Sequence, residues 1–155
     1  MINQIHKFTE STNFTNASKI TIAAVIPVLL FSFFGNFQIG FTIALGAFFT
    51  YPSDIPSSLK HKINGVLITA LLVSGTNLLV NIIYPYAWIF YPFLALLIFF
   101  LSMLSVYGQR ATMVSFSALM SVSLAFAHIK TGWAMIQHAV LILIGGVFYL
   151  LISIL

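Results

Sequence analysis

Cysteine is absent from this sequence, and charged residues are scarce. Without cysteine the chain has no disulfide bridge, no thiolate metal ligand and no cysteine nucleophile. Charged residues make up 5% of the 155 residues, whereas a soluble domain typically carries about 25%. No Gly-rich phosphate loop, HExxH or GxSxG motif occurs either. These absences predict a protein that is not an enzyme and has no metal site and no cofactor.

Carboxylates are the rarest chemical groups in the chain, because Glu10 and Asp54 are the only two. A mechanism that needs paired carboxylates therefore lacks a second partner within the apolar segments. The six basic residues give a net charge of +4. They are spread too widely to form the clustered basic face that binds nucleic acid, so we expect no nucleic-acid partner.

Apolar residues dominate the sequence, at 61% of the total. A membrane-spanning helix needs about 20 apolar residues, with a range of about 17 to 25. Six segments approach this length: 20–34, 37–51, 62–83, 87–106, 110–127 and 133–155. They predict an all-α fold, a polytopic transmembrane bundle of about six helices in the lipid bilayer. The first two segments are separated only by Gly35-Asn36, and the second is short, so they form either a tight helical hairpin or a re-entrant pair.

Both ends of the chain carry further expectations. Residues 1–19 are mostly polar and are predicted to form a cytoplasmic segment, in which Ile2, Ile5 and Phe8 recur at the spacing of an interfacial helix. The segment 133–155 stays apolar up to its last residue. This abrupt end predicts that the chain is part of a longer protein, with a cytoplasmic domain that is missing here.

The basic residues predict the orientation in the membrane, because Lys and Arg are retained on the cytoplasmic side. With six crossings, one side receives five of them and the other receives only Lys130. The five are Lys7, Lys19, Lys60, Lys62 and Arg110. This asymmetry predicts that the N-terminus and the C-terminus are both cytoplasmic.

Polar and small residues follow stripes along three of the predicted helices. Projected at about 100° per residue, one stripe covers a sector of about 40° and the other two cover about 60° and 80°. The stripes are Arg110, Ser117, Ser121 and His128; Lys62, Gly65, Thr69 and Thr76; and Gln38, Thr42 and Gly46. We expect these three helices to turn their polar faces toward one another.

The stripes allow two interpretations, which the sequence leaves open. Small and hydroxyl residues at four-residue spacing let membrane helices approach closely, and this role needs no substrate. Alternatively, the stripes line a substrate pathway, and Lys62 and Arg110 attract anions at its cytoplasmic mouth. Arg110 also opens a helix, whose N-terminal dipole favours an anion. His128, near the opposite end, could take part in ion coupling with Gln137 and His138.

The loop before the third segment also has two interpretations. Ser53 or Asp54 can cap the helix that follows. Alternatively, Asp54, Lys60 and His61 shape a cytoplasmic vestibule.

Two stretches carry a family resemblance. They are GAFFTYPSDIPSSLKHKINGVLITALL, with its basic helix start before Gly65, and SVYGQRATMVSFSALMSVSLAFAH, in which a Gly-containing turn and Arg110 open a small-residue helix. With these features the chain resembles the fusaric-acid-resistance-like (FUSC) membrane proteins, particularly the bacterial inner-membrane branch called YccS/YhfK-like. The whole chain is similar to the N-terminal membrane portion of such a protein.

The resemblance implies a function as well as a fold. The superfamily includes exporters of aromatic acids, and its members carry six-helix membrane units together with a cytoplasmic region. We therefore expect the membrane unit of a multi-pass transporter or channel in the bacterial inner membrane, exporting small aromatic carboxylate-like anions as a homo-oligomer. The alternative is a non-transporting membrane anchor or subunit of a larger complex, whose polar stripes serve helix packing.

Overall fold

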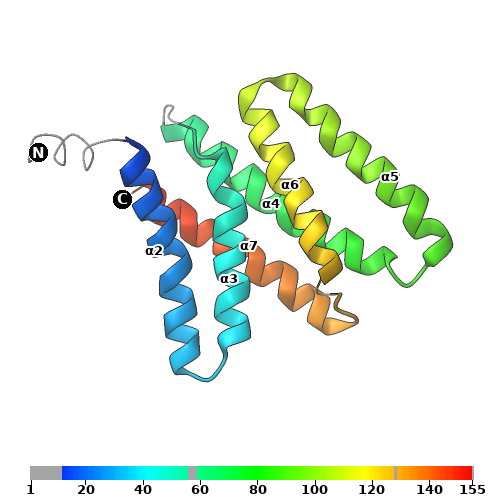
Figure 1. The fold of residues 1–155 in the computed structure, drawn as a ribbon, viewed down its shortest axis with the longest axis horizontal. Helices are drawn as coiled ribbons and strands as arrows, with labels where there is room; N and C mark the ends of the chain where they lie inside the picture. The colour runs from blue at the N-terminus through cyan, green and yellow to red at the C-terminus, as the bar shows by residue number, and fades with distance from the viewer. Residues whose placement is uncertain (1–11, 56–58, 128, 155) are drawn as a thin grey trace, which may run out of the picture.

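The computed structural model describes residues 12–55, 59–127 and 129–154, and the regular structure of these residues is entirely helical (Figure 1). The α-helices are α2 (Thr12–Phe33), α3 (Phe37–Thr50), α4 (Leu59–Ile83), α5 (Ala87–Met103), α6 (Gln109–Ala127) and α7 (Trp133–Ile154). Two short 3-10 helices, η1 (Tyr51–Ser53) and η2 (Leu104–Tyr107), follow α3 and α5. The predicted all-α bundle is therefore confirmed.

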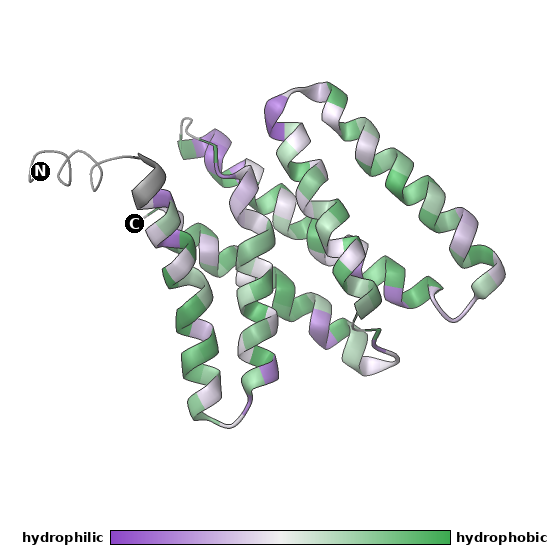
Figure 2. Cartoon of the chain, in the orientation of Figure 1, coloured by the Kyte–Doolittle hydropathy of each residue, from purple (hydrophilic) through white to green (hydrophobic). Residues whose placement is uncertain are grey.

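Five helical segments of the described residues are long and apolar enough to cross a membrane: α2, α4, α5 together with η2, α6 and α7. Figure 2 shows hydrophobic residues along their lengths and hydrophilic residues mainly toward their ends. The 14 residues of α3 extend only about 21 Å at 1.5 Å per residue, compared with a hydrocarbon core of about 30 Å. The chain thus has the helices of a multi-pass membrane protein, with one short helix among them.

Two helices begin earlier than their apolar segments suggested. α2 begins at Thr12, so residues 12–19, which the sequence placed in a separate cytoplasmic segment, belong to the first helix. α4 begins at Leu59 rather than at Lys62. Polar residues continue both helices because the hydrogen bonds between helical turns are made by the backbone, whatever the polarity of the side chains. The interfacial helix predicted near the N-terminus lies outside the described residues.

The six helices are arranged as two hairpins and a crossing pair (Figure 1). The hairpins α2–α3 and α5–α6 form the two sides of the bundle, and α4 and α7 run obliquely across it. α3 packs against α2 and α7, and α4 packs against α6 and α7. Buried apolar side chains form one cluster between α4, α5 and α6 and two further clusters in which α3, α4 and α7 meet, so α4 takes part in all three.

The turn between α2 and α3 closes the first hairpin. Gly35 adopts a φ of 74°, which glycine reaches without steric cost. The backbone N–H of Asn36 donates to the carbonyl oxygen of Phe31 at 2.8 Å. Further along, a Cβ on Gly40 would lie 2.5 Å from the carbonyl oxygen of Pro27, so glycine is what lets α3 lie against α2. This geometry favours the helical hairpin over a re-entrant pair.

A glycine contact holds α3 against α7. A Cβ on Gly46 would overlap the carbonyl group of Ile142, and a Cβ on Gly145 would overlap the backbone of α3. At the neighbouring Gly146, a Cβ would lie 2.6 Å from the Cβ of Ala70 on α4. Small residues of this kind let membrane helices approach backbone to backbone. The crossing therefore ties α3, α4 and α7 into one unit.

The outward faces of α2 and α5 carry large apolar side chains. Within the helices, Leu29 on α2 is 64% exposed and Phe100 on α5 is 66% exposed, and further exposed apolar residues lie along both. Contiguous apolar surface of this extent is unfavourable in water but suits the hydrocarbon core of a bilayer. These two helices thus form the periphery of the bundle.

The glycine crossing predicts the outcome of an alanine substitution. Gly46→Ala or Gly145→Ala should destabilise the protein by about 1–3 kcal/mol or more, because the added methyl forces α3 and α7 apart. The free energy of unfolding in mixed detergent micelles measures the effect.

Gly75→Ala on α4 is the matched control, since nothing lies within 4 Å of its added Cβ. This substitution should be neutral or stabilising by up to about 1 kcal/mol, through helix propensity alone. Equal stability of Gly46→Ala, Gly145→Ala and Gly75→Ala would contradict the close crossing.

Candidate functional site

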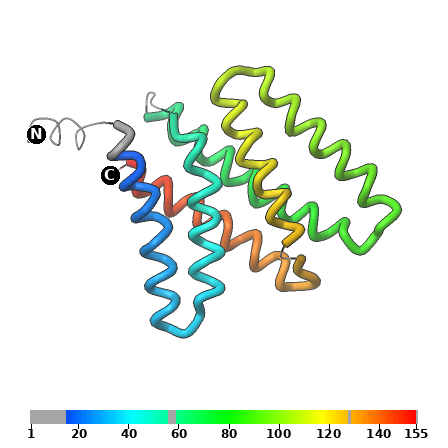
Figure 3. Tube along the Cα trace, in the orientation of Figure 1, coloured from blue at the N-terminus to red at the C-terminus, as the bar shows by residue number. Residues whose placement is uncertain are grey.

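The charged groups of the described residues gather at the two ends of the bundle. At one end, the Nζ atoms of Lys19 and Lys62 donate to the carbonyl oxygen of Ser153, at 2.9 and 3.0 Å. The start of α2, the start of α4 and the end of α7 therefore meet here, as the trace in Figure 3 also shows for α2 and α7. We call this the basic end, because Arg110 also lies here. The opposite end carries Lys130.

A buried carboxylate organises the basic end. The Oδ1 atom of Asp54 lies 3.2 Å from the Nζ of Lys62. Its Oδ2 atom accepts hydrogen bonds from the hydroxyl of Tyr149, at 2.7 Å, and from the hydroxyl of Ser153. The side chain of Asp54 is only 4% exposed, and a carboxylate at such a depth is stable only when it is paired and hydrogen-bonded. Asp54 thereby fastens the α3–α4 connection to the end of α7.

This network changes the interpretation of Asp54 and Lys62. Asp54 points inward to α7, and the hydroxyl of Ser53 donates to the carbonyl oxygen of Thr50 at 2.8 Å, so these bonds do not cap α4. Lys62, which the sequence placed at the mouth of a pathway, is engaged by Asp54 and by the carbonyl oxygen of Ser153. The geometry favours a structural role for Lys62.

Arg110 lies beside α4, where the two stretches that carry the family resemblance meet. Its Nη1 donates to the carbonyl oxygen of His61 at 2.8 Å. Its side chain passes over Gly65, where an added Cβ would lie 3.4 Å from Cδ of Arg110. The side chains of Lys60 and His61 themselves are exposed on the first turn of α4. Of the predicted vestibule residues, these two remain at the surface.

A groove of about 330 Å³ lies between α4, η2 and α6, next to Arg110. Its lining residues are Gly65, Ile68, Leu72, Leu104, Tyr107, Arg110, Ala111 and Val114. Apart from Arg110 and Tyr107, these side chains are apolar or absent. The groove, which we call the Arg110 groove, combines one guanidinium group with apolar walls.

The predicted stripes on α4 and α6 do face each other. Thr69, Thr76, Ser117 and Ser121 are at most 4% exposed, and all lie in this part of the core. The hydroxyls of Thr69, Thr76 and Ser117 donate to carbonyl oxygens of their own helices. Of these four residues, Ser121 alone bonds across the contact, to the carbonyl oxygen of Val73 at 3.1 Å. The contact is closed in this structure, an arrangement that favours the packing interpretation, and His128 lies outside the described residues.

The third stripe, on α3, faces α7 and not α4 and α6. Gln38 and Thr42 of α3 line a cavity together with residues of α7, and Gly46 contacts Ile142 of α7. The expectation that the stripes on α3, α4 and α6 converge is therefore wrong for α3. The reason is the glycine crossing, which packs this face of α3 against α7.

A hydrogen-bonded network that sequence reasoning missed occupies the Lys130 end. The backbone N–H of Lys130 donates to Oδ1 of Asn81 at 2.8 Å. The Nδ2 of Asn81 donates to the side-chain and backbone oxygens of Asn77, at 3.2 and 2.8 Å. The Oδ1 of Asn77 also lies 3.3 Å from Nδ1 of His138.

The order of donors in this network assigns the proton on His138. A backbone N–H can only donate, so Oδ1 of Asn81 accepts, and its Nδ2 must donate to Oδ1 of Asn77. That oxygen is then an acceptor toward His138, which places a proton on Nδ1. Asn77 and Asn81 are each 2% exposed inside an apolar helix, and amides at such positions are the signal that could have revealed this network.

No group of three His, Asp or Glu side chains that could hold a metal ion comes together among the residues that the structure describes.

Residues 65–155, more than half of the chain, match a family model described as FUSC-like inner membrane protein yccS. The matched region begins at Gly65, beneath Arg110, and includes the Arg110 groove and the network at Lys130. No curated protein and no solved structure gives a significant match.

The Asp54 network predicts an energetic coupling between Asp54 and Lys62. Asp54→Asn and Lys62→Gln should each destabilise the protein by about 1–3 kcal/mol, because each leaves a largely buried polar partner unpaired. The double variant should lose less than the sum of the two, with a coupling energy of about 0.5–3 kcal/mol. Unfolding in mixed micelles measures all three variants.

Lys60→Gln serves as the control, since it removes the same charge from an exposed position two residues away. Its effect should stay within about 0.5 kcal/mol. Strict additivity of Asp54→Asn and Lys62→Gln would show that the two side chains do not interact.

Proposed function

Because the chain belongs to the FUSC-like inner membrane protein family, we propose that it is the membrane unit of an inner-membrane transporter that exports small organic anions. The substrate class that fits best is an aromatic carboxylate. The observation that carries this proposal is the Arg110 groove, in which a guanidinium group borders apolar walls at the basic end of the bundle.

The chemistry of the Arg110 groove suits such an anion. A guanidinium group presents donors in a planar fork that matches a carboxylate in two parallel hydrogen bonds. The carbonyl oxygen of His61 holds this fork in place through one N–H. The walls formed by Ile68, Leu72 and Val114 can bury the hydrocarbon part of the anion. The N-terminus of α6, which begins at Gln109, adds a favourable dipole for negative charge.

Passage beyond the groove requires α4 and α6 to separate. Thr69, Thr76 and Ser117 keep their hydrogen bonds within their own helices, so separation leaves their hydroxyls satisfied. The described side-chain bonds that join α6 to α4 are the bond from Ser121 to the carbonyl oxygen of Val73 and, at the groove itself, the bond from Arg110 to the carbonyl oxygen of His61. In this proposal the stripes form the pathway when the contact opens, and the apolar faces of α2 and α5 meet lipid or further copies in a homo-oligomer.

The second candidate is a membrane anchor or subunit that does not transport. It is favoured by the complete burial of the hydroxyl stripes, because packing alone explains their spacing. Under this alternative the α4–α6 contact stays closed, and the Arg110 groove is filled by lipid or by another subunit.

Arg110→Gln tests the role of the Arg110 groove. Export of radiolabelled benzoate, measured as uptake into inverted membrane vesicles, should fall about tenfold or more, since a hydrogen bond to a charged group is worth about 1.5–3 kcal/mol. Arg110→Lys should retain part of the activity because it keeps the charge but loses the fork.

Lys60→Gln again serves as the control, because it removes a positive charge from the same end of the bundle outside the groove. At equal expression, this variant should export benzoate at nearly the rate of the unaltered protein. If Arg110→Gln exports benzoate as fast as Lys60→Gln, the proposed capture by Arg110 is wrong.

Cysteine labelling separates transport from anchoring, since the chain has no native cysteine. Ser117→Cys, which is 1% exposed in the α4–α6 contact, should react with a water-soluble maleimide only while benzoate is being transported. Ser123→Cys makes the same exchange on the exposed face of α6 and should react at a rate that does not depend on benzoate. Complete protection of Ser117→Cys under all conditions would favour the anchor.

A further inference from the structure

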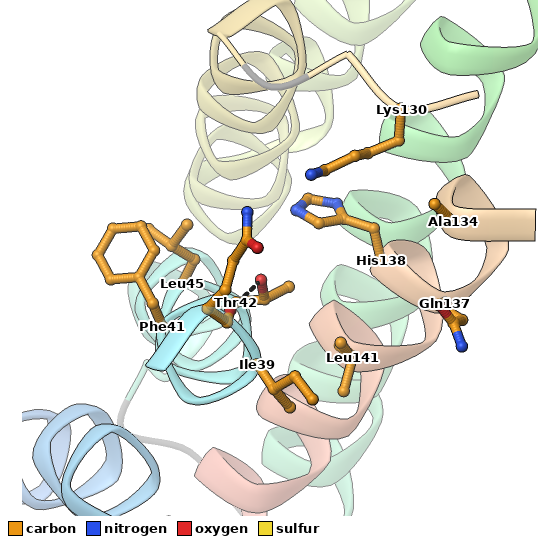
Figure 4. Close-up of a pocket in the computed structure, with 10 residues that line it drawn as sticks. Ile39, Phe41, Thr42, Leu45, Lys130, Ala134, Gln137, His138 and Leu141 are labelled. Carbon is orange, nitrogen blue, oxygen red and sulfur yellow. Dashed lines mark hydrogen bonds between the residues drawn. The ribbon is translucent and has the colours of Figure 1, made fainter. Parts of the chain in front are cut away.

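A cavity of about 230 Å³ lies between α3 and α7 at the Lys130 end of the bundle. Its polar lining residues are Gln38, Thr42, Lys130, Gln137 and His138. Figure 4 shows the side chain of Lys130 ending beside the ring of His138, whereas Gln137 points away from this pair. We call it the Lys130 cavity.

We propose that the Lys130 cavity is a second anion-binding site, which holds the carboxylate of a small organic anion against the ammonium group of Lys130. That this anion is the exported one, held before its release, rests on the function proposed above. The binding site itself rests on the charges and contacts at this end of the bundle.

The first argument is the balance of charge. The sequence has two carboxylates, of which Asp54 is bound to Lys62 at the basic end. The other, Glu10, lies outside the described residues. Within the described part of the chain, therefore, no carboxylate is placed to neutralise Lys130. A half-buried lysine in an apolar bundle favours an anion beside its ammonium group.

The second argument is that the backbone and the ring that line the cavity are held in place before any ligand arrives. The backbone of Lys130 is fixed by Asn81, and the ring of His138 is fixed through Nδ1 by Asn77. Groups ordered in advance lose little conformational entropy on binding. Because Asn81 binds the backbone of Lys130 and not its side chain, the ammonium group has no part in holding the loop.

The third argument is the remaining lining of the cavity. Ile39, Leu45 and Leu141 supply apolar walls next to the polar groups. Ligand sites commonly combine apolar walls with a few polar groups that fix orientation. The combination fits a carboxylate attached to a small hydrocarbon body, as at the Arg110 groove.

Protection of an introduced cysteine tests this site in the reconstituted full chain. Ala134 lines the cavity and is exposed, so Ala134→Cys should react readily with a water-soluble maleimide. Benzoate should slow this reaction, whereas benzamide, its neutral analogue, should not. Adding Lys130→Gln should raise the benzoate concentration for half-protection about tenfold or more, and Lys130→Arg should raise it less.

Thr131→Cys is the control position, since it is exposed in the same loop but does not line the cavity. Benzoate should not protect it. Equal protection of Ala134→Cys by benzamide, or no protection by benzoate, would overturn the anion site. Labelling needs no net transport, so protection without measurable export would count against the proposed function alone, and export without protection would count against this site alone.

Discussion

The crossing of α3 and α7 at Gly46 and Gly145 is the contact on which the rest of the bundle depends. There the two backbones touch, and no side chain separates them. Because the helices cross obliquely (Figure 1), their separation grows in both directions from this point. Toward the basic end, η1 turns the chain back so that Asp54 reaches Tyr149 and closes the gap. Toward the other end, no such connection intervenes, and the Lys130 cavity remains between the helices.

The two ends differ in how their charges are balanced. At the basic end, the single described carboxylate is buried among groups that donate to it, and it fixes Lys62 and the end of α7. Arg110 lies outside this network and is oriented instead by a backbone carbonyl oxygen. At the other end, neutral amides hold the backbone of Lys130 and the ring of His138. The contacts of Lys62 thus favour a structural role for its charge, whereas we propose that Arg110 and Lys130 bind an anion.

The sequence was sufficient to predict the features that depend on residues close together in the chain. Apolar runs and glycine turns predicted the helices, and helical projection predicted that the stripes on α4 and α6 face each other. The partner of α3 could not be predicted in this way, because helical projection gives the direction of a face and not the helix that it meets. The contact of Asp54 with Tyr149 and Ser153 joins residues 95 and 99 positions apart. The pair Gly145-Gly146 was the one local signal of a close helix contact in the last segment.

The contacts of α4 indicate which parts of the bundle can move. Its contact with α7 includes Gly146, which is enclosed by Ala70 and Thr50, so sliding there would drive backbone atoms into side chains. Its contact with α6 is made by side chains whose hydroxyls are satisfied mostly within their own helices. The described side-chain hydrogen bonds between α4 and α6 are those that Arg110 and Ser121 donate to α4. Movement of α4 against α6 therefore meets less steric resistance than movement of α3 against α7, where backbone lies against backbone. α4 borders the Arg110 groove near Gly65, and its Asn77 and Asn81 bind His138 and Lys130 at the other end. A shift of α4 relative to α6 would therefore change the geometry of both sites.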